Sequence, residues 1–142
     1  MSNTDAYRRT MDLLIDEVWN KANLDILPEV FTEDAVMHHG GEEDGGGHDM
    51  VGIAAFREDY MQPTHAAFPG IRHWIKDLLF DGDKVTLRFQ GEGTHAGPLD
   101  GVAPTHKVLR YEGLAIFRME GPLIAEIWVV SSWATQFAAL QE

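Results

Sequence analysis

The fold of this chain is decided by residues 83–132, which read DKVTLRFQGEGTHAGPLDGVAPTHKVLRYEGLAIFRMEGPLIAEIWVVSS. Apolar and polar side chains alternate over most of this stretch, and runs that contain glycine and proline interrupt the alternation twice. Successive side chains of a β-strand point to opposite faces of its sheet, so this period of two predicts strands. We predict three of them, at Lys84–His95, Lys107–Arg118 and Leu123–Ser132.

Each predicted strand has one face that is mostly apolar. If the three faces line one concave sheet, the apolar wall carries a few polar groups, which is typical of a pocket for a small molecule. The inward residues would be Val85, Leu87, Phe89, Gly91, Gly93 and His95 in the first strand, Leu109, Tyr111, Gly113, Ala115 and Phe117 in the second, and Ile124, Glu126, Trp128, Val130 and Ser132 in the third.

The residues before this stretch predict helices and two further strands. Apolar residues recur every three or four positions between Met11 and Ala22, which predicts a first helix capped by Thr4 or Asp5. A short helix with Pro28 in its first turn should follow, then a strand at Ala35–His39 and a glycine-rich loop at Gly40–Gly47. We next expect a helix at Ile53–Met61, ended or kinked by Pro63, and a strand at Ile71–Phe80, closed by an Asp81-Gly82-Asp83 turn. After the three main strands, Trp133–Leu140 should form a helix or tail.

This order of elements predicts a single α+β domain over residues 1–142, with helices covering one face of a curved antiparallel sheet. The absence of cysteine excludes disulfides, thiolate nucleophiles and cysteine zinc sites. A net charge of −12 argues against nucleic acid and anionic membranes as partners. No apolar run approaches the roughly 20 residues of a membrane-spanning helix, and no signal peptide is recognisable, so we expect a cytoplasmic protein.

Several short motifs, in this order, resemble a known family. They are Phe31-Thr32-Glu33-Asp34 with His38, Ala67-Phe68-Pro69-Gly70, Gly82-Asp83-Lys84-Val85 with Arg88, Gly93-Thr94-His95-Ala96-Gly97, Gly101-Val102-Ala103-Pro104-Thr105 and Ile124-Ala125-Glu126-Ile127-Trp128. Together they resemble the SnoaL-like polyketide cyclase or ester cyclase family of the nuclear transport factor 2-like superfamily. The resemblance implies a cone-shaped barrel with a deep apolar pocket, and a homodimer packed through the outer face of the sheet.

The resemblance also implies an acid/base residue near the end of the last strand, where characterised cyclases of this type have an aspartate. By its spacing from Glu126 and Trp128, that position is Ser132 here. A neutral serine does not replace a carboxylate as a base unless another group deprotonates it. The proton transfer would therefore fall to other residues.

Histidine is the first candidate, because its pKa of about 6.5 suits proton transfer at neutral pH. His38 resembles a pocket position of the family and is our first choice of base, assisted by His95 or Glu126. His95 can equally hold its loop in place. Glu126 can equally pair with Arg110 or Arg118 near the entry of its strand.

The remaining candidates would bind the substrate. Ser132 and Tyr111 would hydrogen-bond its carbonyl oxygen, and Tyr60 could do the same. The other expected binding residues are Trp19, Met37, Phe89 and Trp128, of which Trp19 can equally be a core aromatic.

A metal site can be imagined from His38, His39 and His48 with Glu42, Glu43 and Asp44. Adjacent strand residues point apart and the intervening glycines give no fixed geometry, so we expect neither a metal nor another cofactor. His65, His73 and His106 flank predicted turns and are expected to face solvent. Trp74 and Trp133 are expected in the core or at an interface.

Two classes of function remain open. The first is a cofactor-free enzyme that abstracts a proton beside the carbonyl of a small aromatic or polycyclic compound, followed by aldol, retro-aldol or isomerisation chemistry. The second is a non-catalytic binding protein that kept the pocket and lost the aspartate. Epoxide hydrolysis ranks behind both, because Arg88 and Arg110 are predicted to point outward.

Overall fold

The computed structural model describes residues 2–38 and 49–142, and the predicted loop at Gly40–Gly47 lies outside them. Six strands form one curved, unclosed sheet in the order β2-β1-β6-β5-β4-β3. The strands are β1 (Phe31–His38), β2 (Met50–Val51), β3 (Arg72–Asp81), β4 (Lys84–Thr94), β5 (Val108–Glu120) and β6 (Leu123–Ser131). This is the predicted α+β architecture, with one departure: β1 pairs with β6 in parallel, whereas the other neighbours are antiparallel.

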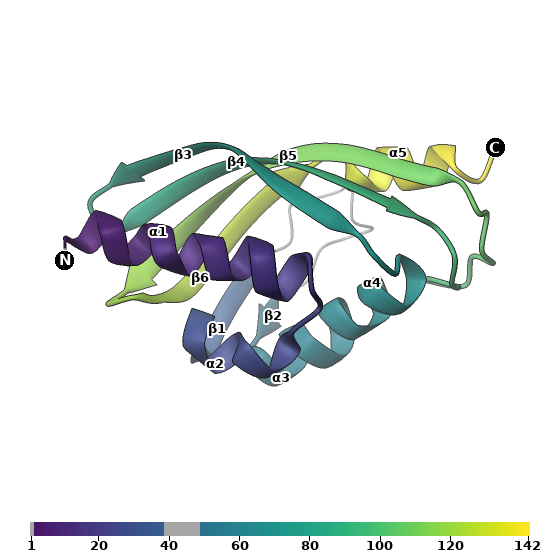
Figure 1. Ribbon diagram of the computed structural model, residues 1–142. Helices are drawn as coiled ribbons and strands as arrows, with labels where there is room; N and C mark the ends of the chain where they lie inside the picture. Colours follow the sequence, from purple (N-terminus) through teal and green to yellow (C-terminus); the bar gives the residue numbers. More distant parts are fainter. Residues whose placement is uncertain (1, 39–48) are drawn as a thin grey trace.

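The helical segments lie mainly on one side of the sheet. In Figure 1, β3 to β6 arch over α1, while α2, α3 and α4 lie below the arch beside β1 and β2. The segments are α1 (Asn3–Leu13), the π-helix η1 (Leu14–Trp19), the 3₁₀ turn η2 (Leu24–Ile26), α2 (Leu27–Val30), α3 (Ile53–Ala55), the π-helix η4 (Phe56–Met61), α4 (Gln62–Ala67) and α5 (Trp133–Ala139).

Two local predictions about the helices need correction. The cap of α1 is Ser2, whose Oγ accepts a hydrogen bond from the backbone N–H of Asp5 at 3.1 Å, rather than Thr4 or Asp5. Pro63 does not end the helix at residue 61, because it sits in the first turn of α4, where its missing N–H costs little.

The hairpin between β3 and β4 follows the predicted turn. Asp81 pairs with Lys84, and Gly82 has the positive φ of 61° that such a tight turn favours. This turn fixes the register of β3 against β4, on which the site described below depends.

A β-bulge in β6 changes which residues face the interior. Arg118 pairs with Glu126, but Met119 pairs with Ile124, so Ala125 is an extra residue in β6. The alternation inverts at this point, and the predicted inward face of the last strand is wrong beyond Ile124. The inward residues are Ile127, Val129 and Ser131, while Glu126, Trp128 and Val130 point to the outer face.

The core fills the space between the helices and the concave face of the sheet. Among its fully buried side chains are Met11, Val18, Leu27, Phe68 and Leu109. The inward faces predicted for β4 and β5 are confirmed, because their residues from Val85 to His95 and from Leu109 to Phe117 are buried or nearly so.

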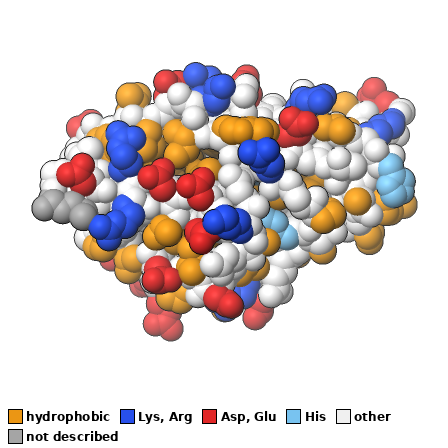
Figure 2. Space-filling view, in the orientation of Figure 1, with side chains coloured by type: hydrophobic (Ala, Val, Ile, Leu, Met, Phe, Trp, Pro, Cys, Tyr) orange, Lys and Arg blue, Asp and Glu red, His pale blue; other side chains and the backbone are white. Residues whose placement is uncertain are grey.

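Charged side chains of both signs mingle on the surface. Figure 2 shows acidic and basic groups interspersed over the face that contains α1, without a continuous basic stripe. Within residues 2–38 and 49–142, no helix is long and apolar enough to cross a bilayer.

Candidate functional site

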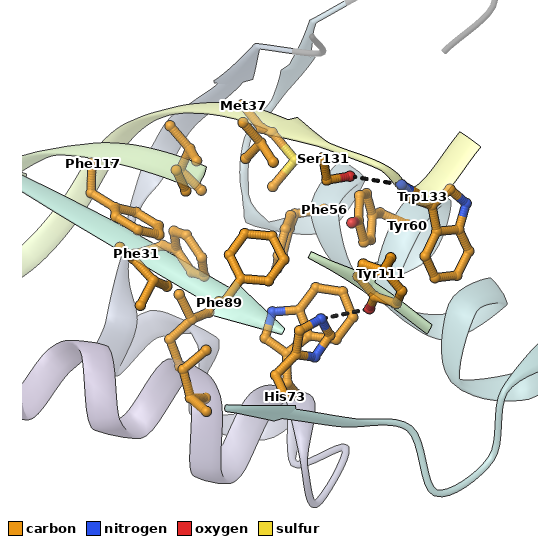
Figure 3. Close-up of a pocket in the computed structure, with 17 residues that line it drawn as sticks. Phe31, Met37, Phe56, Tyr60, His73, Phe89, Tyr111, Phe117, Ser131 and Trp133 are labelled. Carbon is orange, nitrogen blue, oxygen red and sulfur yellow. Dashed lines mark hydrogen bonds between the residues drawn. The ribbon is translucent and has the colours of Figure 1, made fainter. Parts of the chain in front are cut away.

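A cavity of about 70 Å³ lies between the concave face of the sheet and the helices. Most of its wall is aromatic or aliphatic, as Figure 3 shows. Among the described residues that line it, those with a hydroxyl or imidazole group are Tyr60, His73, Tyr111 and Ser131, and no aspartate or glutamate is present.

Two π-helical segments supply the helical side of the wall. η1 contributes Leu14, Ile15 and Trp19, and η4 contributes Phe56 and Tyr60. Such wide helical turns are rare in proteins and are frequent at functional sites. They bring the rings of Trp19 and Tyr60 together edge to face, with centroids 5.9 Å apart.

The central polar feature is a hydrogen bond of 2.6 Å between Tyr111 Oη and His73 Nε2 (Figure 3). His73 pairs with Gly91 across β3 and β4, and Gly91 pairs with Tyr111 across β4 and β5. The tyrosine ring therefore crosses a whole strand to reach the histidine. Gly91 makes this possible, because a Cβ atom there would lie 2.6 Å from the Tyr111 oxygen.

Burial keeps both partners neutral. His73 is 4% exposed, and desolvation, aided by the nearby His65, lowers its pKa to about 3. Burial raises the pKa of the Tyr111 hydroxyl well above its ordinary value of 10, and Tyr60 adds to the effect. The pair thus holds a neutral imidazole and a protonated phenol at neutral pH.

The second ring nitrogen of His73 indicates how the proton of this hydrogen bond is placed. His73 Nδ1 is buried and has no hydrogen-bond partner among the described residues. An orphaned buried N–H is rarer than an under-used acceptor, which favours the tautomer with the proton on Nε2. Nε2–H then donates to Tyr111 Oη, and the Tyr111 O–H is left to donate into the cavity.

Ser131 is the second hydroxyl at this end of the cavity. Its Oγ accepts a hydrogen bond from the backbone N–H of Trp133 at 3.3 Å, which ties the end of β6 to the start of α5 (Figure 3). Trp133, expected in the core or at an interface, forms part of the cavity wall and meets the Tyr111 ring edge-on at 4.9 Å.

Five of the residues expected to bind substrate lie on the cavity wall, and their binding role stays a prediction. They are Trp19, Met37, Tyr60, Phe89 and Tyr111. Trp128, by contrast, lies on the outer face of the sheet and is 37% exposed, because the bulge at Ala125 reverses its direction.

The expected catalytic pair His38 and Glu126 also lies outside the cavity. His38 Nε2 is 2.6 Å from Glu126 Oε2, His38 Nδ1 is 3.0 Å from Asp49 Oδ2, and Arg118 Nε is 3.0 Å from Glu126 Oε1. The His38 ring stacks on Trp128 at 5.3 Å. The prediction that His38 and Glu126 face the pocket is wrong, and the alternative pairing of Glu126 with Arg118 is confirmed.

These contacts move two pKa values in opposite directions. The hydrogen bond to Glu126 raises the pKa of His38, with Asp49 adding to the effect. The hydrogen bonds from His38 and Arg118 lower the pKa of Glu126. The cluster is therefore a set of surface ion pairs.

His95 and Ser132 each hydrogen-bond a backbone N–H group, which gives them structural roles. His95 is fully buried, and its Nδ1 accepts a hydrogen bond from the Thr105 backbone N–H at 3.2 Å, so it holds its loop as the alternative interpretation proposed. Ser132 Oγ accepts from the backbone N–H of Glu112 at 3.1 Å. Neither residue lines the cavity, so their expected place on its wall is wrong.

His73 is the functional candidate that the sequence interpretation missed, because it was expected to face solvent. A signal was present: Ile71, His73 and Ile75 alternate at strand spacing, which puts the histidine on the same face as two apolar residues. His65 is half-buried and bonds the Val18 carbonyl at 3.0 Å, whereas His106 is exposed as expected.

The remaining sequence hypotheses concern metal and epoxide chemistry. Arg88 and Arg110 point outward as predicted, in ion pairs with Asp77 and Glu92. Residues 2–38 and 49–142 contain no cluster of three side chains able to hold a metal ion. The other members of the imagined metal set, His39, Glu42, Glu43, Asp44 and His48, lie outside the described residues.

Comparison with known proteins agrees with this architecture. The model of one family, the SnoaL-like polyketide cyclases, matches residues 9–140. The chain belongs to this family. Solved structures of SnoaL-like proteins share the α+β fold described above.

Three solved structures illustrate the relationship. A candidate SnoaL-like polyketide cyclase from Jannaschia has a TM-score of 0.82 at 17% identity, covering 96% of this chain and 92% of its own. IdmH, a candidate polyketide cyclase from Streptomyces antibioticus, has a TM-score of 0.79 at 27% identity, and the match covers 100% of both chains. AclR, a candidate hydroxylase from Streptomyces galilaeus, has a TM-score of 0.79 at 21% identity, and the match covers 99% of this chain and 83% of AclR. No curated protein matches the chain.

Proposed function

We propose that this SnoaL-like chain is a cofactor-free enzyme that binds a small aromatic or polycyclic carbonyl compound and promotes its enolate chemistry. The reaction would be an aldol or retro-aldol step, as in a cyclase or lyase, or an isomerisation. The observation that carries the proposal is the 2.6 Å hydrogen bond between Tyr111 and His73 inside an otherwise apolar cavity.

Tyr111 would act as the hydrogen-bond donor to the substrate carbonyl. Negative charge develops on that oxygen as the enolate forms, and a fixed donor in an apolar site stabilises it more than water does. The raised pKa keeps the phenol proton in place. Neutral His73 orients the phenol by donating to its oxygen, so the donor does not reorganise during the reaction.

The choice of substrate follows from the weakness of the available bases. No carboxylate is among the described residues of the cavity wall, and His73, with a pKa of about 3, is a poor base. A methylene group that lies between a carbonyl and either a second carbonyl or an aromatic ring is acidic enough for water in the cavity to take up its proton once the enolate oxygen is stabilised. Such methylenes are characteristic of polyketides, the compounds after which the family is named.

The lack of a carboxylate among the described residues of the cavity wall also favours the second candidate function, a binding protein without catalysis. Ser132, which directly follows β6, stands where the family resemblance implies an aspartate. A cavity that retains its aromatic walls and one donor can hold a ligand without transforming it.

Solvent deuterium exchange into 2-tetralone, a bicyclic aromatic ketone, separates the two functions. We expect the wild-type protein to accelerate exchange at the carbon beside the carbonyl, and Tyr111→Phe to lose about a hundredfold of this rate, as on removal of one oxyanion donor. Binding of 2-tetralone without accelerated exchange would favour the binding protein. An undiminished rate in Tyr111→Phe would remove Tyr111 from the proposed mechanism.

We also propose that the chain forms a homodimer through the outer face of the sheet. Leu114 pairs with Val130 and Ile116 with Trp128, and these four side chains, the outer apolar patch, are 37–68% exposed. An exposed contiguous apolar patch is typical of a protein interface. A cytoplasmic location remains a prediction from the sequence.

A further inference from the structure

Asn20 binds the backbone of His73 through both ends of its carboxamide. Asn20 Nδ2 donates to the His73 carbonyl at 3.1 Å, and the His73 N–H donates to Asn20 Oδ1 at 2.6 Å. The two residues are 53 positions apart in sequence and belong to the end of η1 and the start of β3.

This contact occupies the free edge of the sheet. β3 is the last strand in the sheet order, and His73 faces Gly91 of β4 on its other side. In an antiparallel pair, a residue directs both backbone groups either to its partner or away from it. Those of His73 reach Asn20, so they point away from β4, and the carboxamide replaces a neighbouring strand at this one residue.

The same short helix also fixes the imidazole ring of His73. Trp19, directly before Asn20, packs on that ring with centroids 4.0 Å apart. The Asn20 N–H bonds the Ile15 carbonyl at 3.0 Å, which is the wide π-type turn that ends η1. Backbone and ring of the histidine are therefore both held from residues 19 and 20.

We propose that Asn20 is a positioning residue for the Tyr111–His73 pair. The inference rests on the proposed function, because it concerns the alignment of the donor that this function needs. Within the described part of the chain, only the Nε2 atom of the His73 ring has a hydrogen-bond partner, so the backbone anchor sets where Nε2 meets the phenol oxygen. Asn20 is not among the cavity-lining residues, so its loss should disturb alignment rather than substrate contact.

The test uses Asn20→Ala, which removes both hydrogen bonds, and Asn20→Asp, which keeps an acceptor for the His73 N–H and loses the donor. Thr10→Val is the matched control. The Thr10 hydroxyl is buried and bonds the Ala6 and Pro122 carbonyls, away from the cavity wall. For each variant we would measure thermal stability, the ¹⁵N spectrum of the His73 ring without ligand, and kcat and KM for deuterium exchange into 2-tetralone.

We expect Asn20→Ala to lower kcat about ten- to a hundredfold with KM unchanged, since small misplacements of catalytic groups have effects of this size. The His73 ring signals should change from one tautomer to an average of two, and Asn20→Asp should lie between wild type and Asn20→Ala. Thr10→Val should lose stability while keeping the wild-type ring spectrum and kcat.

Two results would overturn the inference. One is an Asn20→Ala protein that loses stability but keeps the wild-type ring spectrum and kcat, since that is a purely structural effect. The other, if Asn20→Ala does not fold, is an Asn20→Asp protein with both readouts unchanged. If the wild-type protein gives no exchange, the proposed function fails, and the ring spectrum alone then decides whether Asn20 positions the pair.

Discussion

The Tyr111 hydroxyl reaches His73 Nε2 across an intervening strand, at 2.6 Å, by passing over Gly91. Three directly paired residues of β3, β4 and β5 thus build one polar group in an apolar cavity. Its geometry depends on the register of three paired strands and on the absence of a side chain at Gly91. A donor held in this way fits the requirement that a catalytic dipole be oriented before the reaction.

Gly91→Ala should break this arrangement. The added methyl group would lie 2.6 Å from the Tyr111 oxygen, so the ring has to move away from His73. We expect a loss of about 1–3 kcal/mol in the free energy of unfolding, as for other overpacked cores, and a loss of catalysed deuterium exchange. Urea unfolding and the 2-tetralone assay measure the two effects.

Gly93→Ala is the control for this change, on the same face of the same strand. A Cβ there meets side-chain atoms of Ile71 and Phe68 at 3.2–3.3 Å and does not touch Tyr111. We expect a smaller loss of stability and a wild-type exchange rate. Equal losses of activity in the two variants would mean that general packing, rather than the Tyr111–His73 contact, controls the reaction.

His73 should make the protein less stable in acid. Its pKa is lowered to about 3 in the folded chain from the ordinary 6.5, so the unfolded chain binds the proton first. The stability is complete above pH 6.5 and falls towards pH 3, with a slope of up to about 1.4 kcal/mol per pH unit from this group. In His73→Gln, urea unfolding at a series of pH values should show a shallower slope over this range.

His38 should affect the pH dependence of stability in the opposite direction from His73. Its raised pKa means that its stabilising contribution is complete below pH 6.5 and is lost as the pH rises through the raised value. Glu126 has a lowered pKa, so its contribution is present above pH 4.5 and is lost as the pH falls through the lowered value. The pair therefore stabilises the fold between these limits.

His38→Gln should accordingly lower the melting temperature most near pH 6 and progressively less at higher pH. His106→Gln, at an exposed position outside the cluster, provides the control and should follow the wild-type curve at every pH. A constant difference between His38→Gln and wild type from pH 5 to pH 9 would show that the ion pairs with Glu126 and Asp49 do not contribute.

The sequence was sufficient for the α+β fold class and for much of the cavity wall. Period-two alternation in β4 and β5 located the inward residues, among them Phe89 and Tyr111, because both strands run without a bulge against each other. The helical stripe of the first helix put Trp19 on the buried side of that helix, and the structure shows that its ring lines the cavity. These features follow from local spacing, which a sequence displays directly.

The contacts at the polar centre of the site could not be predicted in the same way. The bulge at Ala125 inverts the faces of β6, and one extra residue in an apolar strand leaves no mark in its hydrophobic pattern. Because of that inversion, Ile127 and Ser131 face the cavity, where Glu126 and Ser132 were predicted. The pairing of His73 with Tyr111 depends on the register of three strands, which the spacing within any one strand does not specify.

The outer apolar patch gives a prediction about assembly. Val130 is 68% exposed and pairs with Leu114 at the middle of the convex face. If two copies pack through this face, Val130→Glu buries unpaired charges in the interface and should convert the dimer into a monomer, which sedimentation velocity measures. Val108→Glu, at the far end of β5 and 42% exposed, should remain dimeric. A wild-type chain that sediments as a monomer at high concentration would exclude the homodimer, and the apolar patch would then need another partner.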